Sequence, residues 1–177
     1  MKLTYAGLAA IASATGALAD DQIVIVNKGD DSITLLDAAS YERAGDVGVG
    51  GNPHEVYVSP DGETAYVSDY GGAQGTTISV VDLENATRTA VWDLQGNRGP
   101  HGIWVSSDGS LVWATTETTG TVIELSSATG AVMNVWETGQ QVSHQLVPTP
   151  DGAKLYIANI GSGSVTVIDR IANTVTT

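Results

Sequence analysis

The sequence predicts an all-β fold in which one four-stranded antiparallel unit recurs along the chain. Three similar turn segments end in Asp-Gly, at residues 59–62, 106–109 and 149–152, and their Asp residues are spaced by 47 and 43 residues. Short runs that alternate β-branched or aromatic residues with small ones flank each turn, which is typical of strands. Between them no segment has helical spacing over a useful length. Four short strands repeated about every 45 residues indicate the blades of a β-propeller.

The composition agrees with an acidic, turn-rich globular protein. The 177 residues are 42% hydrophobic, enough for a buried core, and include 21 Gly that suit tight turns. The chain has 20 acidic and 7 basic residues, a formal net charge of −13, which argues against binding to nucleic acid or to anionic membrane surfaces. Because the sequence has no Cys, disulfides, iron–sulfur clusters and thiol catalysis are excluded within it.

The first element is expected to be a signal peptide over residues 1–19. One Lys precedes a short apolar run that ends in Ala17-Leu18-Ala19, the small-x-small pattern read by signal peptidase. The run is too short and too rich in Ala, Gly and Ser to indicate a membrane span. We therefore expect an exported chain, periplasmic or secreted, without a membrane span after cleavage. An uncleaved N-terminal anchor is the alternative.

Residues 20–177 are expected to form the blades in order. The first unit begins at residues 23–27 and supplies only the second, third and fourth strands of a blade. Each of the next three units starts with a short inner strand that ends in a turn, because residues such as Pro60 preset φ and Gly62 accepts positive φ. In the second unit the four strands are expected at residues 54–59, 63–69, 77–82 and 88–95.

These repeats resemble the YVTN-type β-propeller family. The second unit reads P-H-x-V-x-V-S-P-D-G-x-x-x-Y-V-x-D, and residues 66–69 and 156–159 stand where that family has Tyr-Val-Thr-Asn. The third unit departs from the pattern, with Trp-Ala-Thr-Thr at residues 113–116, and is also similar to virginiamycin-B-lyase-like and lactonase-type propellers. The resemblance extends from Ile23 to Thr177 and implies a fold more firmly than an activity.

The resemblance also implies an incomplete ring. Members of that family commonly have seven blades, which at this repeat length need about 300 residues. Residues 20–177 contain about four blades, so the first interpretation is part of a seven-bladed ring in a truncated sequence. The alternative is a homodimer in which two chains close one ring. Alone, the partial ring would expose apolar faces and unpaired strand edges.

Three histidines are the sharpest functional feature. His54, His101 and His144 share one repeat position, seven residues before the Asp of each turn. That position lies in the loop entering the innermost strand, so the imidazoles are expected at one mouth of the central channel. Converging imidazoles suit a transition metal. Alternatively, each histidine ties strands together by bonding a turn Asp, or acts in acid–base catalysis.

Resemblance to two other propeller families indicates which metals the histidines could bind. Nitrous-oxide reductase propellers hold a copper cluster with inner-strand histidines, to which these three are similar in position. Lyase-like propellers use Glu and His around magnesium, and Glu117 lies in a loop expected on the histidine face. The candidate cofactors are therefore copper, iron or magnesium. His54, His101 and His144 are the candidate metal ligands, and Glu117 is a further ligand-binding candidate.

The other repeated residues are interpreted as structural. Asp61, Asp108 and Asp151 supply one carboxylate per turn, too few for calcium, and are expected to cap the amides of their own turns. Aromatic residues at repeated strand positions are expected to pack between blades; they are Tyr57, Trp104, Tyr66, Trp113 and Tyr156. No phosphate-binding loop or nucleophile elbow occurs.

These features predict an exported β-propeller that serves as a binding or scaffold protein. Its ligand, a small molecule or a protein, is expected at the channel mouth formed by the histidines and Glu117. One alternative is the propeller domain of a periplasmic metal-dependent oxidoreductase, and another is a lactonase or lyase-type enzyme. The sequence leaves open whether the chain is an enzyme.

Overall fold

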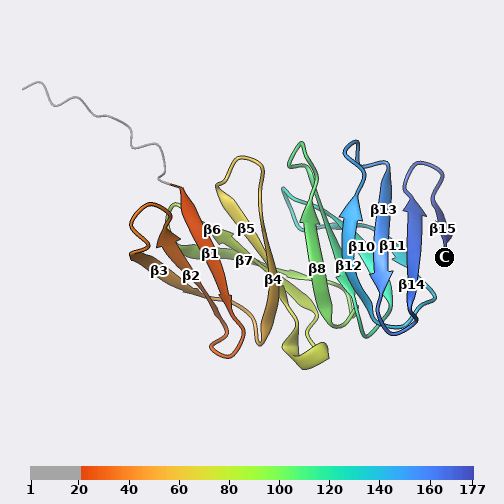
Figure 1. The fold of residues 1–177 in the computed structure, drawn as a ribbon, viewed down its shortest axis with the longest axis horizontal. Helices are drawn as coiled ribbons and strands as arrows, with labels where there is room; N and C mark the ends of the chain where they lie inside the picture. The colour runs from red at the N-terminus through yellow and green to blue at the C-terminus, as the bar shows by residue number, and fades with distance from the viewer. Residues whose placement is uncertain (1–20) are drawn as a thin grey trace, which may run out of the picture.

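The computed structural model describes residues 21–177, which form β-strands joined by short turns. The expected signal peptide, residues 1–19, lies outside the described residues. The strands form four antiparallel sheets, one with three strands and three with four, which follow one another along the chain as blades 1 to 4 (Figure 1). The predicted all-β propeller fold is confirmed. Within residues 21–177, no helix is long and apolar enough to cross a membrane.

The strands follow one another as a simple meander in every blade. Blade 1 consists of β1 (Gln22–Asn27), β2 (Ser32–Asp37) and β3 (Arg43–Gly48). Blade 2 consists of β4 (Pro53–Val58), β5 (Thr64–Asp69), β6 (Thr77–Asp82) and β7 (Thr87–Asp93). Blade 3 consists of β8 (Pro100–Val105), β9 (Leu111–Thr116), β10 (Thr121–Ser126) and β11 (Val132–Glu137). Blade 4 consists of β12 (Ser143–Pro148), β13 (Lys154–Asn159), β14 (Ser164–Asp169) and β15 (Thr174–Thr176).

The Asp-Gly turns have the structure that the sequence predicts. The Ser59 hydroxyl donates a hydrogen bond of 2.5 Å to Asp61, whose carboxylate also accepts from the backbone N–H of Glu63. Gly62 adopts a φ of 78°, a conformation that Gly reaches without strain. Asp108 and Asp151 accept equivalent hydroxyl bonds at 2.6 Å. The interpretation of these Asp residues as turn formers is therefore confirmed.

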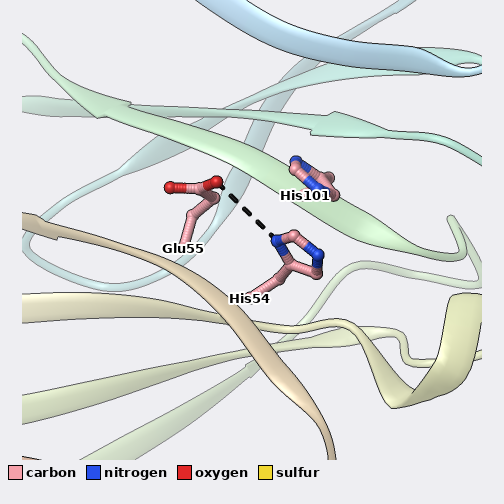
Figure 2. Close-up of side chains that lie close together, drawn as sticks. All are labelled: His54, Glu55 and His101. Atoms are coloured by element: carbon pink, nitrogen blue, oxygen red, sulfur yellow. Dashed lines mark ion pairs between the residues drawn. The ribbon is translucent and has the colours of Figure 1, made fainter. Parts of the chain in front are cut away.

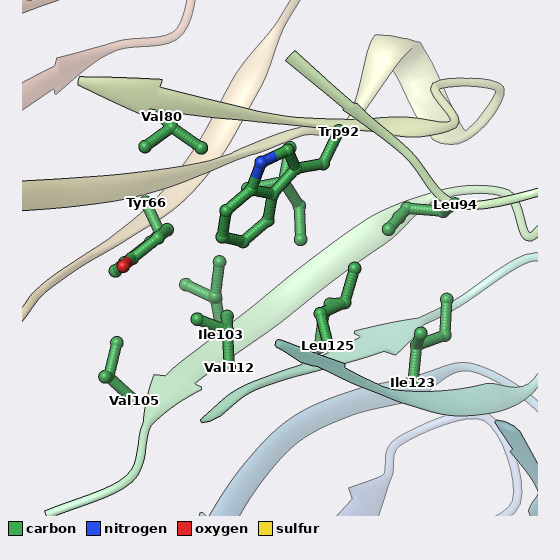
Figure 3. Close-up of a cluster of buried hydrophobic side chains, with 11 residues drawn as sticks. Tyr66, Val80, Trp92, Leu94, Ile103, Val105, Val112, Ile123 and Leu125 are labelled. Carbon is green, nitrogen blue, oxygen red and sulfur yellow. The ribbon is translucent and has the colours of Figure 1, made fainter. Parts of the chain in front are cut away.

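Apolar side chains fill the spaces between successive blades, and each fully buried large side chain stabilises the fold by roughly 1.5–3 kcal/mol. Between blades 2 and 3 lies the cluster in Figure 3, which includes Tyr66, Val80, Trp92, Leu94, Ile103, Val105, Val112, Ile123 and Leu125. The predicted interblade positions of Tyr66 and Trp113 are confirmed, since both are buried. Tyr156 is 40% exposed, because no further blade among the described residues packs against blade 4.

Two details differ from the sequence expectations. The sequence predicts no helical segment, whereas the loop between β5 and β6 contains the short 3-10 turn η1 (Gly71–Ala73), inside which Gly72 adopts a φ of 60°. The fourth strand of blade 2 also ends earlier than expected, at Asp93 rather than at residue 95. Of the first strands, β8 lies between β4 and β12 and contacts both, and together they form the inner edge of blades 2 to 4 (Figure 1). They position the candidate site.

Candidate functional site

The three histidines come together at one end of the inner strands. His54, His101 and His144 occupy the second position of β4, β8 and β12. They therefore lie within the strands rather than in the loops entering them, which corrects the sequence expectation. Because β8 lies between β4 and β12, the rings form a row. The centroid distances are 3.9 Å from His54 to His101 and 3.9 Å from His101 to His144.

A close approach of blades 3 and 4 makes this row possible. A Cβ atom at Gly102 would lie 2.7 Å from the carbonyl oxygen of His144, so only Gly fits there without a shift. The Thr115 hydroxyl accepts a hydrogen bond from the Gly102 N–H at 2.9 Å and donates one to the His144 carbonyl at 2.6 Å. Gly102 and Thr115 therefore set the spacing of His101 and His144.

Glu117 faces two of the histidines from the loop between β9 and β10. Its Oε1 lies 2.5 Å from His144 Nδ1 and 4.0 Å from His101 Nε2. Its Oε2 accepts a hydrogen bond of 2.7 Å from the Tyr70 hydroxyl. The side chain is 10% exposed, and the Glu117 N–H donates to the carbonyl of Gly99. The expected position of Glu117 on the histidine face is therefore confirmed.

Glu55 brings a second carboxylate to the row. Its Oε1 lies 3.7 Å from His54 Nδ1, and both side chains face His101 on the neighbouring strand (Figure 2). The Gln145 side-chain amide donates a hydrogen bond of 2.9 Å to the same Glu55 oxygen. Because β12 supplies Gln145 and β4 supplies Glu55, this bond spans the mouth from blade 2 to blade 4.

Burial makes His101 a neutral base. Its side chain is 2% exposed, and this burial, with the charges of His54 and His144, lowers the pKa of His101 to about 4. The Nδ1 atoms of His54 and His101 are buried without a hydrogen-bond partner among the described residues. An unpaired polar atom in such surroundings costs about 1–3 kcal/mol. A bound ligand that accepts the imidazole lone pair would remove that cost.

The carboxylate of Glu117 stays ionised beside the rings. Burial alone would raise its pKa, but the hydrogen bonds with His144 and Tyr70 and the nearby histidines lower the pKa below its ordinary value. The hydrogen bond between Tyr70 and Glu117 has the opposite effect on Tyr70. Burial and the Glu117 carboxylate raise the pKa of the Tyr70 phenol to about 12. The Tyr70 hydroxyl therefore keeps its proton and holds Glu117 in place.

The arrangement contains two overlapping sets of metal-ligating side chains. One set is His101, Glu117 and His144, and the other is His54, Glu55 and His101. In each set the potential ligand atoms lie within 4.8 Å of one another. Nitrogen and oxygen atoms so placed can bind a divalent metal ion. Hydrogen bonds from Tyr70 and Gln145 to the two carboxylates supply the outer contacts typical of such sites.

The alternative in which each histidine bonds a turn Asp does not agree with the structure. Among the described residues, no histidine forms a hydrogen bond with Asp61, Asp108 or Asp151. These turns follow the C-terminal ends of the inner strands, whereas the histidines lie near the N-terminal ends.

Sequence reasoning missed several residues of the site. Glu55, Gly102 and Gln145 all occupy the repeat position directly after a histidine, and comparing that position between units would have found them. Thr115 belongs to residues 113–116, where the third unit differs from the Tyr-Val-Thr-Asn pattern. That difference is a second feature of the sequence that could have indicated the site. Tyr70 occupies the same repeat position as Glu117, directly after the tetrapeptide, but an aromatic residue there does not by itself indicate a contact with a carboxylate of the next blade.

Comparison with known proteins places the chain among β-propellers. No protein-family profile matches it. A seven-bladed β-propeller protein of Mycobacterium tuberculosis is 31% identical over 130 residues, which are 73% of this chain and 32% of the relative. The chain therefore spans about a third of the length of that curated relative.

Two solved structures share the fold at lower identity. Hydrazine synthase of Kuenenia stuttgartiensis matches with a TM-score of 0.79 and 23% identity over 88% of this chain and 45% of that one. A protein of unknown function from Desulfotomaculum acetoxidans matches with a TM-score of 0.69 and 14% identity, over 88% of this chain and 50% of that one. At these identities the likeness concerns the fold alone.

Proposed function

Starting from a β-propeller fold, we propose that the channel mouth of this chain binds a divalent transition-metal ion through His101, Glu117 and His144. The observation that carries the proposal is the convergence of these three side chains, whose potential ligand atoms lie within 4.8 Å of one another, with the buried His101 between two other imidazoles. Glu117 adds a fixed negative charge within 4.0 Å of His101. A cation at this point would be neutralised and coordinated by groups already in place.

The donor atoms indicate which metals fit. Imidazole nitrogen suits zinc, copper, iron and nickel. Magnesium instead prefers oxygen ligands in an octahedral arrangement, so the histidine row supports it less than the transition metals. Of the three metals expected from the sequence, copper and iron therefore fit the site better than magnesium. Zinc has the same ligand preference and serves as a redox-inert probe.

Isothermal titration of the metal-free chain with Zn²⁺ and Cu²⁺ tests the proposal. We expect one equivalent to bind with a Kd of about 1 μM or tighter, and Mg²⁺ at millimolar concentration not to compete. Glu117→Gln should weaken Zn²⁺ binding at least ~10-fold, and His144→Ala should do so as well. Glu63→Gln, at an exposed turn position, is the matched control and should bind like the parent. The absence of saturable Zn²⁺ and Cu²⁺ binding would reject the site.

A metal-dependent oxidoreductase is the second candidate function. Two imidazoles and one carboxylate, as in His101, Glu117 and His144, are also the donor set of non-haem Fe(II) oxygenases, which keep other coordination positions open. Stoichiometric Fe(II) binding with oxygen consumption dependent on Glu117 would favour this function. Iron binding without oxygen consumption would favour a binding or scaffold role.

We further propose that the chain is a YVTN-type propeller that is exported to the periplasm or secreted. The repeated tetrapeptide positions support the family, and the small-x-small pattern at residues 17–19 supports export. Expression with the chain's own N-terminus and sequencing of the product tests export. A product beginning at Asp20 is expected, and one that retains Met1 would contradict cleavage.

A further inference from the structure

The end of the inner strands opposite to the histidines holds a groove of about 690 Å³. It lies where β4, β8 and β12 run into their Asp-Gly turns, so three blades contribute to its walls. Its volume falls within the roughly 300–1,000 Å³ typical of small-molecule sites. None of the proposed metal ligands lines it, so the groove is independent of the histidine row.

Two aromatic rings form part of the groove wall. Tyr57 on β4 and Trp104 on β8 have ring centroids 4.8 Å apart, with planes inclined by 39°. Both side chains are only half-buried and line the groove. Pro148 and Pro150 add rigid apolar groups from blade 4. The groove therefore combines an apolar enclosure with aromatic faces, which attract cations through the negative potential of the ring.

Two carboxylates give the groove a negative charge. Asp108 and Asp151 line it from the turns of blades 3 and 4. In each carboxylate, Oδ1 accepts the hydroxyl bond at 2.6 Å and a backbone N–H, whereas Oδ2 has no hydrogen-bond partner among the described residues. The Ser106 hydroxyl bond and then the Ser110 bonds lower the pKa of Asp108 to about 2, so the charge persists at neutral pH.

Arg170 is the basic residue of the lining, and its charge is already paired. Its Nε lies 2.6 Å from Oε2 of Glu124, a carboxylate that is 4% exposed. Its Nη1 donates a hydrogen bond to the Gly152 carbonyl, and its guanidinium lies 4.8 Å from the Trp113 ring centroid. Within residues 21–177, neither Asp108 nor Asp151 forms an ion pair.

We propose that this groove binds an organic cation, an ammonium group carried on a small apolar body. The ammonium group would lie against the faces of Tyr57 and Trp104 and near the unpaired oxygens of Asp108 and Asp151. A net charge of −13 would favour the approach of a cation. A bare Ca²⁺ ion fits less well, because it requires six to eight oxygen ligands.

Choline and its uncharged isostere 3,3-dimethylbutan-1-ol are the probes that test the proposal, titrated into the EDTA-treated full chain and followed by ligand-observed NMR. We expect choline to bind with a Kd of about 1 mM or tighter and the isostere at least ~10-fold more weakly. Equal binding of both probes would overturn the cation preference. No saturable binding of choline up to about 20 mM would overturn the site.

Matched variants locate the binding. The double variant Asp108→Asn, Asp151→Asn should weaken choline binding at least ~5-fold. Asp61→Asn changes the equivalent carboxylate of blade 2, which does not line the groove although Pro60 of the same turn does, and should leave binding unchanged. An equal loss of choline binding in the double variant and in Asp61→Asn would contradict the location of the site in this groove. EDTA removes bound metal, so choline binding is measured independently of the histidine site. A failure of choline to bind would not count against the metal site, and a failure of metal to bind would not count against the groove.

Discussion

Gly102 determines how closely blades 3 and 4 approach beside the histidine row. We predict that Gly102→Ala pushes β12 away, since its Cβ would lie 2.7 Å from a backbone oxygen. The shift should lower the free energy of unfolding by about 1–3 kcal/mol and weaken Zn²⁺ binding at least ~10-fold. Denaturant unfolding and calorimetry measure the two effects. Gly48→Ala, where a Cβ would meet nothing within 4 Å, is the control, and equal losses in both variants would contradict this role.

The turn carboxylate of Asp108 predicts a specific pH dependence. Hydrogen bonds hold its pKa at about 2 in the folded chain, against an ordinary value of 3.8. A lowered folded-state pKa stabilises the protein above the ordinary pKa, and that contribution is lost as the pH falls from about 4 to 2. Urea unfolding of Asp108→Asn and the parent should therefore give curves that converge over this range. A difference in unfolding free energy that is constant from pH 5 to pH 2 would contradict the assignment.

The sequence predicts the three histidines and Glu117 but misses the residues that contact them from neighbouring blades. His54, His101 and His144 share one repeat position, so their convergence follows from stacking identical units. Glu55 and Gln145 occupy one shared position with different side chains, and their bond joins residues 90 apart in the sequence. Such a contact depends on the curvature of the blade arc, which no local pattern specifies.

At the scale of the blades, the ion pair between Arg170 and Glu124 helps to join blade 3 to blade 4. Arg170 contacts Glu124 across the blade interface, and both side chains are largely buried. We predict that Arg170→Met lowers the free energy of unfolding by about 3–5 kcal/mol, because it leaves a buried carboxylate unpaired. Arg43→Met removes an exposed ion pair with Asp46 and should cost under about 1 kcal/mol. Similar losses in both variants would show that the pair does not stabilise the interface.

The strand order was predictable because each blade combines alternating apolar residues with Asp-Gly turns. In blade 2 the expected strands agree with the observed ones to within two residues. The last residue of the tetrapeptide, Asp69 in blade 2 and Asn159 in blade 4, holds neighbouring strands together. Asp69 accepts hydrogen bonds from Thr77 and Ser79, and Asn159 donates one to Thr166. The turn η1 was not predictable, because its geometry depends on a single Gly-rich loop.

The acidic character of the whole molecule predicts a response to salt. With 20 acidic and 7 basic residues, the folded chain concentrates negative charge, and screening reduces that repulsion. We expect the thermal midpoint to rise as NaCl increases from about 10 mM to 500 mM, where the Debye length falls from roughly 30 Å to about 4 Å. Thermal unfolding followed by circular dichroism measures this. An unchanged midpoint would remove self-repulsion as a determinant of stability.

On the same scale, the inner strands carry different chemistry at their two ends. Imidazoles, the largely buried Glu117 and the partly exposed Glu55 gather at one end. Aromatic rings and exposed carboxylates gather at the other. Both ends arise from the same repeat, since each inner strand starts near a histidine and ends in an Asp-Gly turn. A stack of such units therefore builds two chemically different surfaces from one sequence pattern.

The most direct test of this account is X-ray absorption at the zinc edge of the Zn²⁺-loaded full chain. The account predicts a first shell with at least two imidazole nitrogens and a carboxylate oxygen at about 2.0–2.2 Å, and loss of one oxygen contribution in Glu117→Gln. A shell of six water-like oxygens without imidazole scattering would contradict a metal site at the histidine mouth.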